Sequence, residues 1–401
     1  MGGCNVPGVD DLPLFDPEAA ARSDDRDAVL AEFRARNWIA RSERGFEVFT
    51  YERCDQALRD PDWLHGIVDT AASVGMPPAR QESQGRNLLT SEGETHAALR
   101  RAVQPWFTPR RTEQLRRQTR ALAERLIDDL TAHGQGDFLS EVAARIPATV
   151  FCWMIGAPDE DAPQLAAWSQ SGLKIFKGNP ADLPEISAAL RGLHRYVRSL
   201  VEMKRRDPGD DLVSHLLQAV DDGALAERDM ASITTEILAA SSDNTSHSAT
   251  VSAWLMCRYP DQWRRLQADR SLIPGAVEEA MRYEPRIRCA KRFSGAEAEL
   301  GGLSFPPATR LFLHVAAAHR DPAVYPDPDQ FDVGRRLQRP QLNFGAGRHL
   351  CLGAGLARME QQEILGAMLQ AWGEVSLGDD PRLTFDDGLH VERLPIEVLP
   401  N

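Results

Sequence analysis

The stretch NFGAGRHLCLGAG, residues 343–355, sets Cys351 among four glycines and two residues after a histidine, His349. A cysteine thiolate is a soft ligand, suited to iron, zinc or copper. A tetrahedral zinc site needs three or four protein ligands, and no CxxC or HxxxH pattern accompanies this stretch. The pattern therefore favours a metal that takes one ligand from the protein.

A haem iron meets that condition, because the porphyrin supplies four ligands and one axial thiolate completes the protein's share. Gly345, Gly347 and Gly353 would let the backbone turn tightly and approach a flat macrocycle. Cys351 would stand just before a helix, whose N-terminal dipole stabilises a thiolate. The alternative is a buried structural cysteine in a glycine-rich turn.

The composition is that of a globular protein of 401 residues, with 42% hydrophobic and 26% charged residues. A net charge of −13 argues against binding nucleic acid or an anionic membrane through overall charge. Six scattered cysteines form no disulfide framework, which fits a reducing cytosol. No apolar run reaches the roughly 18 residues that span a bilayer. We expect a cytoplasmic protein without nucleic-acid or membrane partners.

The order of patterns along the chain predicts a mostly α fold with small β-sheets (α+β), in a single large domain over 1–401. Residues 45–58 read as a strand running into a helix, and 64–92 as a long loop. Residues 93–285 are mostly helical, with one long helix over about 228–258. Strand-like pieces at 298–319, a proline-rich stretch at 320–336 and a final helix after Cys351 follow.

Three further groups of residues are spaced so that their side chains could act together. Glu279 and Arg282 are three apart, and His96 and Arg100 four apart, so each pair shares a helix face. A surface ion pair and a solvated basic face are the ordinary explanations. Six polar residues interrupt the apolar pattern of the long helix. Burying polar side chains costs free energy unless they serve a function. The alternative is a helix-packing seam of small residues. The six polar residues are Ser241, Ser242, Asp243, Asn244, Thr245 and Ser248.

Taken together and in this order, these motifs resemble the cytochrome P450 family, soluble bacterial type. FGAGRHLCLG (344–353) matches the haem-thiolate signature, and Glu279 with Arg282 matches the ExxR motif. RDPAVYPDPDQFD matches the segment before the signature, and HAALRR matches the HxxxR segment. The resemblance implies the P450 fold, haem b as cofactor, and a distal oxygen-binding helix over about 228–258.

The resemblance also implies roles for individual residues. Cys351 is the axial thiolate and the metal ligand, with Phe344 shielding the sulfur and Gly345 and Gly353 in the cofactor-binding loop. The haem propionates are expected to bind His96, Arg100, Arg292 and His349. Glu279 and Arg282 are expected to be a buried structural pair.

One departure from the family lies in the oxygen-binding helix. Where the family usually has an acid followed directly by threonine, this chain has Asp243 followed by Asn244, with Thr245 one place later. Asn244 can hydrogen-bond but relays protons less well than a hydroxyl, and Thr245 is turned about 100° further around the helix. Proton delivery is expected from Asp243, ordered water or a substrate group.

Substrate contacts are expected from Ser241, Ile287 and Arg288. If residues 285–292 run as a strand, Arg288 and Arg292 lie on one side of it, because side chains alternate. Arg288 would then anchor an anionic or carbonyl-bearing substrate, bind a propionate, or turn away and pair with an acidic residue. These three alternatives stay open.

The implied activity is that of a monooxygenase that oxidises a small organic molecule with dioxygen, in bacterial secondary metabolism. Hydroxylation is the default outcome, with oxidative coupling or cyclisation as others. Ferredoxin and ferredoxin reductase are the expected electron donors, and a monomer the expected state. The alternatives are a peroxide-driven P450 and a non-catalytic P450-like partner protein. A basic cluster favours docking of an acidic ferredoxin over a merely solvated face. Its members are Arg100, Arg101, Arg110, Arg111, Arg116 and Arg117.

Overall fold

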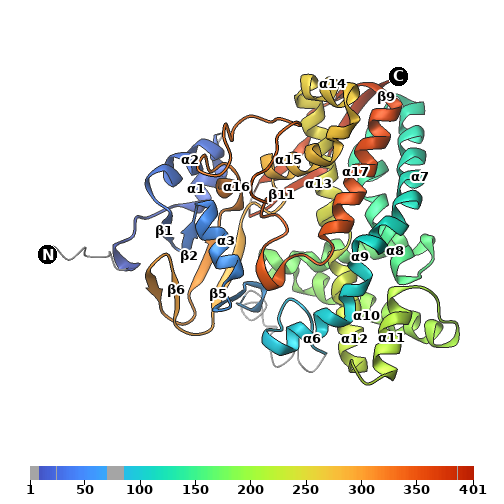
Figure 1. The fold of residues 1–401 in the computed structure, drawn as a ribbon, viewed down its shortest axis with the longest axis horizontal. Coiled ribbons are helices and arrows are strands. Elements are labelled where there is room, and N and C mark those ends of the chain that lie inside the picture. Colours follow the sequence, from blue (N-terminus) through green and yellow to red (C-terminus); the bar gives the residue numbers. More distant parts are fainter. Residues whose placement is uncertain (1–8, 24, 70–84, 386) are drawn as a thin grey trace. The chain divides into compact units, whose positions relative to one another are not determined.

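Helices dominate the structure, a computed structural model that describes residues 9–23, 25–69, 85–385 and 387–401 (Figure 1). The helices are α1 (Pro17–Arg22), α2 (Arg26–Arg36), α3 (Tyr51–Arg59), α6 (Gly93–Val103), α7 (Pro109–His133), α8 (Arg145–Ile155), α9 (Ala162–Leu173), α10 (Leu183–Arg206), α11 (Leu212–Asp221), α12 (Glu227–Ala240), α13 (Asp243–Arg258), α14 (Pro260–Ala268), α15 (Ile273–Tyr283), α16 (Val315–His319) and α17 (Ala354–Ala371). The strands are β1 (Ile39–Ser42), β2 (Gly45–Val48), β3 (Trp63–His65), β4 (Gln135–Asp137), β5 (Ala290–Ser294), β6 (Ala298–Leu300), β7 (Leu303–Phe305), β8 (Arg310–Leu313), β9 (Trp372–Leu377), β10 (Arg382–Phe385), β11 (Leu389–Arg393) and β12 (Pro395–Pro400). The predicted fold class, mostly α with small sheets, is confirmed.

The chain folds into two compact units. The first comprises Met1–Gly66, Glu278–Cys351 and Thr384–His390, and the second comprises Ile67–Val277, Leu352–Leu383 and Val391–Asn401. Each unit is assembled from segments far apart in the sequence. For this reason the sequence offers no linker at which to divide it.

The first unit is built around a five-stranded sheet of order β1-β2-β8-β5-β3. β2 runs parallel to β8, and the other neighbours are antiparallel. The predicted strand and helix over 45–58 are β2 and α3, joined through Thr50 at the helix N-cap. The first two residues of the predicted loop over 64–92 are part of β3 instead, because Trp63–His65 pair with β5. Residues 70–84 of that loop lie outside the described residues.

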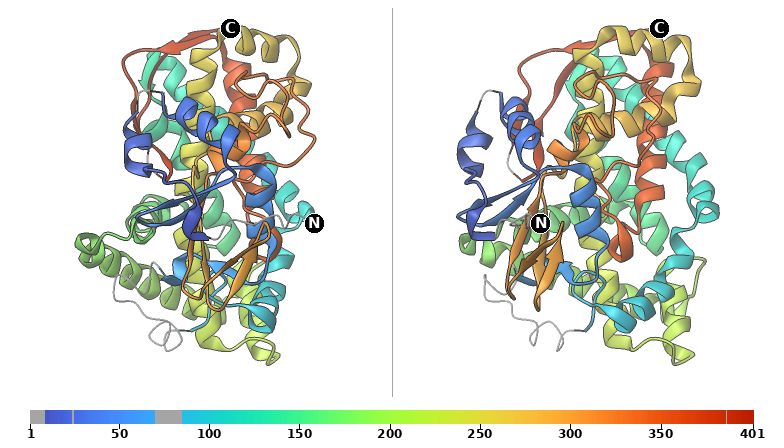
Figure 2. Two further views of the ribbon diagram at one scale, coloured as in Figure 1. Left: turned by 90° about the vertical axis from the view of Figure 1, so that its left-hand side faces the viewer. Right: turned by 60° about the vertical axis from the view of Figure 1, so that its left-hand side comes forward.

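The second unit is a helical body with a three-stranded sheet of order β4-β12-β9. Helices α7 and α17 pack along each other, as two directions of view show (Figures 1 and 2). α7 begins at Pro109 and ends at His133, and Gly134, with a φ of +71°, forms the left-handed cap after it. No helix in the described parts of the chain is both long and apolar enough to cross a membrane.

The predicted long helix over about 228–258 is wrong in one respect, because two helices replace it. α12 ends at Ala240 and α13 begins at Asp243, with Ser241 and Ser242 between them. The Ser241 hydroxyl donates to the Leu238 carbonyl at 2.9 Å, within its own turn. Such a bond competes with the regular helix ladder, so the polar run divides the predicted helix into two.

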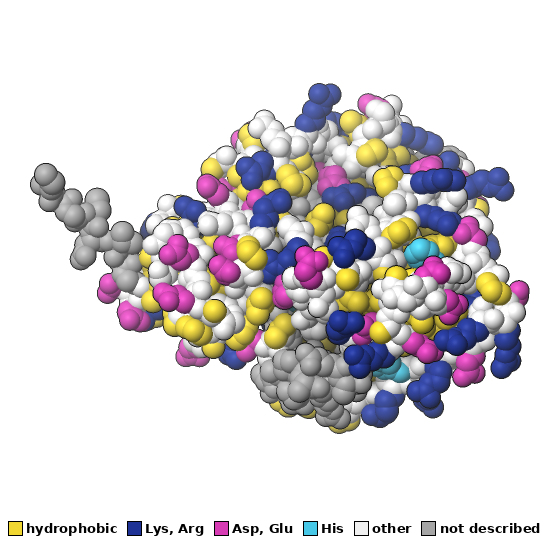
Figure 3. Space-filling model, turned by 60° about the horizontal axis from the view of Figure 1, so that its bottom comes forward, with side chains coloured by type: hydrophobic (Ala, Val, Ile, Leu, Met, Phe, Trp, Pro, Cys, Tyr) yellow, Lys and Arg dark blue, Asp and Glu magenta, His cyan; other side chains and the backbone are white. Residues whose placement is uncertain are grey.

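Several arginines of the predicted docking cluster already have acidic partners in the second unit. Arg111 pairs with Asp210 at 2.8 Å, and Arg116 with Glu363 at 2.5 Å. Arg101, Arg110 and Arg117 are exposed. On the face shown in Figure 3, Lys and Arg side chains are interspersed with Asp and Glu. Only part of the cluster is therefore available to an acidic partner.

Candidate functional site

The glycine-rich stretch forms a tight loop that returns on itself and presents Cys351. The Cys351 N–H donates to the Phe344 carbonyl at 2.8 Å, closing the loop. Gly345 and Gly347 have φ values of +68° and +69°, which favour glycine. A Cβ on Gly347 would lie 2.8 Å from Cα of Arg59, so the loop rests against the end of α3 without room for a side chain. Both positions have a conformational reason to be glycine, and Gly347 has a steric reason as well.

The loop fits a flat cofactor with one axial sulfur ligand. Cys351 is exposed, whereas Cys54, Cys152 and Cys289 are buried. A Cβ built on Gly353 would meet no atom within 4 Å, and one on Gly345 would meet only the His349 carbonyl, at 3.8 Å. The helix that follows, α17, begins at Ala354, three residues after Cys351 along the chain, so its N-terminus is the end next to this cysteine in the sequence. The donor, the open glycine positions and the helix end agree with the haem-thiolate expectation.

Two of the predicted propionate partners come together in the first unit, with a third residue between them. Arg292 on β5 is the register partner of His65 on β3. The His65 and His349 rings lie 5.8 Å apart between centroids. His65 was not singled out from the sequence, because its position beside Arg292 depends on strand pairing across more than 200 residues, which no local pattern reveals. Arg292, His65 and His349 form one group of cationic and hydrogen-bonding side chains.

The predicted Glu279–Arg282 pair is buried, as expected. Arg282 donates to the Glu279 carboxylate through Nε at 2.7 Å and Nη2 at 2.8 Å, and both side chains are 0% exposed. Arg335 adds a third charge, with Nε 3.0 Å from Glu279 Oε1. Arg282 also donates to the His319 and Pro328 carbonyls. The pair therefore holds α15 to the proline-rich segment and is not available for chemistry.

Arg288 is occupied by acidic residues of its own unit. It donates to Glu284 at 3.0 Å and to Asp27 at 2.5 Å. The strand predicted over 285–292 is shorter, since β5 begins at Ala290. The N–H groups of Arg288 and Cys289 both donate to the Asp387 carbonyl, so side chains do not alternate here as predicted. Of the three alternatives for Arg288, the structure favours pairing with an acid.

Ile287 lies beside the same turn. Its N–H donates to Asn343 Oδ1 at 3.3 Å, and it forms an isolated bridge with Gly388. This contact links the segment after α15 to the start of the Cys351 loop. A substrate contact by the Ile287 side chain stays a prediction.

In the second unit, His96 and Arg100 lie on α6, one turn apart, so the predicted helical spacing is confirmed. His96 is buried and Arg100 is partly exposed. Their binding to propionates stays a prediction.

The predicted oxygen-site residues open helix α13. Asp243, Asn244 and Thr245 are its first three residues, and Ser241 lies in the break before them. His247 approaches Asp243, with Nδ1 2.8 Å from the Asp243 carbonyl and 3.5 Å from its carboxylate Oδ1. His247 was not singled out from the sequence, although its i+4 spacing from Asp243 predicts this contact. The acid of this segment therefore has a titratable neighbour.

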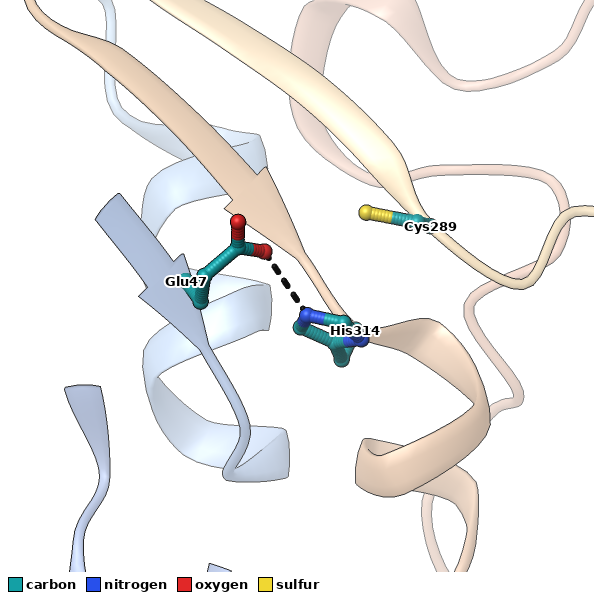
Figure 4. Close-up of side chains that lie close together, drawn as sticks. All are labelled: Glu47, Cys289 and His314. Atoms are coloured by element: carbon teal, nitrogen blue, oxygen red, sulfur yellow. Dashed lines mark hydrogen bonds and ion pairs between the residues drawn. The ribbon is translucent and has the colours of Figure 1, made fainter. Parts of the chain in front are cut away.

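A buried group in the first unit has the residue types of a metal site but the contacts of an ion-pair network (Figure 4). It consists of Glu47, Cys289 and His314, with His314 Nε2 2.8 Å from Glu47. Arg44 occupies the same space, donating to Glu47 at 2.8 Å and lying 3.9 Å from the Cys289 sulfur. Burial raises the pKa of Cys289 well above its usual value, and Asp387 adds to this. A protonated thiol beside a fixed guanidinium is a poor metal ligand.

Comparison with known proteins identifies the family. The sequence model described as Cytochrome P450 matches residues 173–399. Luteothin monooxygenase of Streptomyces thioluteus is 32% identical over 366 residues, 90% of each chain. The 6-deoxyerythronolide B hydroxylase of Saccharopolyspora erythraea is 32% identical over 315 residues, 78% of this chain and 77% of that one. The solved structure of a mutant of P450 EryK in complex with erythromycin B has a TM-score of 0.83 and 28% identity, covering 94% of this chain and 97% of that one. The chain belongs to the cytochrome P450 family, whose members are monooxygenases with haem b as cofactor.

Proposed function

We propose that this protein is a haem-thiolate monooxygenase with Cys351 as the axial ligand, acting on a small organic molecule of bacterial secondary metabolism. Hydroxylation is the proposed reaction, and the electrons come from a ferredoxin and its reductase. The observation that carries the proposal is the exposed Cys351 in the closed loop between Phe344 and α17. Relatives named as monooxygenases and hydroxylases support it.

Bound haem would supply dioxygen activation, which an electron-rich axial thiolate favours. In the first unit, Arg292, His349 and the newly found His65 would hold propionate oxygens, because they gather beside the Cys351 loop. In the second unit, His96 and Arg100 share one face of α6 and would serve the same purpose. Phe344 would cover the sulfur, and Gly345 and Gly353 would leave the macrocycle room.

Proton delivery is proposed to start from Asp243. Its carboxylate lies 3.5 Å from His247 Nδ1, and the two could exchange a proton directly or through water. Asn244, next in the chain, would hold a water or a substrate group by hydrogen bonding, since its amide neither gains nor loses a proton near neutral pH. Thr245 is the hydroxyl available if Asn244 does not fill this role.

The test is the spectrum of the reduced protein with carbon monoxide. The wild type is expected to show the strongly red-shifted Soret band of thiolate-ligated haem, and Cys351→Ser to lose it. Cys289→Ser is the matched control and should keep the band, because Cys289 is a buried, protonated thiol. A well-folded wild type with the spectrum of a histidine-ligated haem, or a band lost in the Cys289 variant alone, would overturn the assignment.

A further inference from the structure

Residues Gly85–Leu89, called here the strap, lie along one face of α12 in the second unit. Asp229, Ser232 and Glu236 of α12 are spaced by three and four residues, so they share that face. The Arg86 N–H donates to Asp229 Oδ1 at 2.8 Å, and its guanidinium donates to Oδ2 at 2.6 and 3.0 Å. The Ser232 hydroxyl donates to the Gly85 carbonyl at 3.3 Å.

The other end of the strap is held by one carboxylate. The N–H groups of Leu88 and Leu89 donate to the two oxygens of Glu236, at 2.7 and 2.8 Å. Burial raises the pKa of Glu236 to about 7, and these two donors oppose the rise. Leu88 also packs against the hydrophobic cluster of the second unit. Glu236 thus replaces the missing backbone partners of a segment that belongs to no helix or strand.

The strap approaches α12 too closely for an ordinary side chain at its start. A Cβ on Gly85 would lie 2.3 Å from the Arg228 carbonyl oxygen, and Gly85 has a φ of +111°. The Asp229 side chain is 0% exposed. Burial would raise its pKa, but hydrogen bonds from Arg86 lower it, so the strap is held by a charged carboxylate. Backbone geometry and charge pairing therefore agree on one position of the strap.

We propose that Asp229 and Glu236 are positioning residues of the monooxygenase, which hold Leu88 and Leu89 in place as a wall that discriminates between ligands by size. This rests on the proposed function. Two observations connect the strap to the site residues. Glu236 lies one turn before the end of α12, and Asn244 follows eight residues later, in the first turn of α13. Four residues after the strap, α6 begins and carries His96 and Arg100.

The test compares Glu236→Gln with Glu227→Gln in the haem-loaded protein. A carboxamide presents an N–H₂ group where an acceptor is needed, so one strap N–H loses its partner. Glu227 is the matched control, because it lies on the same helix and pairs with Arg205 at the surface. Hydrogen–deuterium exchange of residues 85–92 and optical titrations with imidazole and 4-phenylimidazole are the readouts.

In Glu236→Gln, the Leu88 and Leu89 amides are expected to exchange about tenfold faster. The dissociation constant of 4-phenylimidazole should rise about tenfold, while that of imidazole stays within about twofold, because only the larger ligand reaches the wall. Arg86→Lys should act in the same direction with a smaller effect, since it keeps the charge and loses the fork. If Glu236→Gln does not fold, Arg86→Lys still tests the proposal.

The proposal is overturned if the ratio of the 4-phenylimidazole dissociation constant to that of imidazole is the same in Glu236→Gln and Glu227→Gln, even if exchange is faster. Unchanged exchange would overturn it as well. Failure of the proposed function looks different. In that case the wild type itself would show no absorption shift with either azole.

Discussion

At the scale of single residues, the strongest constraints are charges that are buried together. Glu279 accepts hydrogen bonds from Arg282, Arg335 and the Asp332 N–H. Arg282 uses its remaining donors on backbone carbonyls. These additional hydrogen bonds offset the free-energy cost of removing the two charges from water. The motif therefore fixes α15 to the segment that precedes the Cys351 loop in the sequence.

Removing one member of this group should be severe. Glu279→Ala removes the carboxylate that balances the charges of Arg282 and Arg335, and the expected cost is ~3–5 kcal/mol of folding stability. The result would be aggregated or haem-free protein, measured by soluble yield and Soret absorbance. Glu18→Ala is the control, since the Glu18–Arg22 pair is 77% and 78% exposed and should cost less than about 1 kcal/mol. Equal losses of soluble yield and Soret absorbance in both variants would contradict the assignment of Glu279 and Arg282 as a buried structural pair.

His319 gives a pH-dependent contribution to stability. Burial lowers its pKa from 6.5 to about 3, helped by Arg282. Its Nε2 accepts from the Leu342 N–H at 2.6 Å, which requires the unprotonated nitrogen. The unfolded chain therefore binds more protons between these pH values. The contribution is full above pH 6.5 and is lost as the pH falls toward 3, by up to about 1.4 kcal/mol per pH unit.

The corresponding experiment follows the melting temperatures of the wild type and His319→Gln from pH 8 to pH 5. The gap between them should narrow as the pH falls, because only the wild type loses this contribution. Glu360 acts in the opposite direction, since burial raises its pKa to about 8. Its contribution is shared by both proteins and cancels in the difference. A gap independent of pH would show that His319 is protonated as easily in the folded state as in the unfolded one.

At the scale of elements, the Cys351 loop is shaped by the end of α3. Gly347→Ala adds a Cβ 2.8 Å from the Arg59 Cα, on a residue with φ of +69°. Left-handed strain alone costs about 1–2 kcal/mol, and backbone displacement adds to it. Gly223→Ala separates the two effects, since Gly223 has φ of +73° and no atom within 4 Å of the added Cβ.

Gly347→Ala is accordingly expected to lower haem content and melting temperature, whereas Gly223→Ala should lower the melting temperature slightly and keep the haem. Haem retention per folded protein is the deciding measurement. If both variants lose haem equally, the contact with α3 does not shape the loop.

At the scale of the whole molecule, a net charge of −13 is combined with exposed arginines at Arg101, Arg110 and Arg117. An acidic electron donor would be repelled by the protein as a whole and attracted locally. Arg111 and Arg116 contribute less, because Asp210 and Glu363 hold them. Docking is thus expected to depend on the arginines that the fold leaves exposed.

Charge reversal tests this expectation. Arg117→Glu should slow haem reduction by ferredoxin about tenfold at low salt, and the difference should shrink as salt screens the charges. Arg191→Glu on α10 is the control and should change the rate little, although Arg191 is also exposed. A loss that is equal in the two variants would point to overall charge rather than to a docking surface.

Local features of the chain were sufficient to predict the tight glycine-rich turn at Cys351 and the shared helix faces of His96 with Arg100 and of Glu279 with Arg282. In each case the residues that matter are within ten positions of one another, and glycine conformation or helix periodicity relates them. The burial of the Glu279–Arg282 pair was expected only from the resemblance to the family. The same local reasoning showed that polar residues would disturb the helix near Ser241. It did not show that the helix would end, because side-chain bonds from Ser and Thr to the backbone can bend a helix as well as interrupt it.

Partners that are distant in sequence were decided by the tertiary structure alone. Arg288 pairs with Asp27, 261 residues away, although the sequence left a substrate, a propionate and an acidic residue open as its partner. His65 reaches the neighbourhood of His349 only because β3 pairs with β5, and the strap finds Glu236 only because it packs on α12. A charge or an N–H accepts many partners at similar energy, so the choice among them is made by whichever chain segments the packed core brings within about 3 Å.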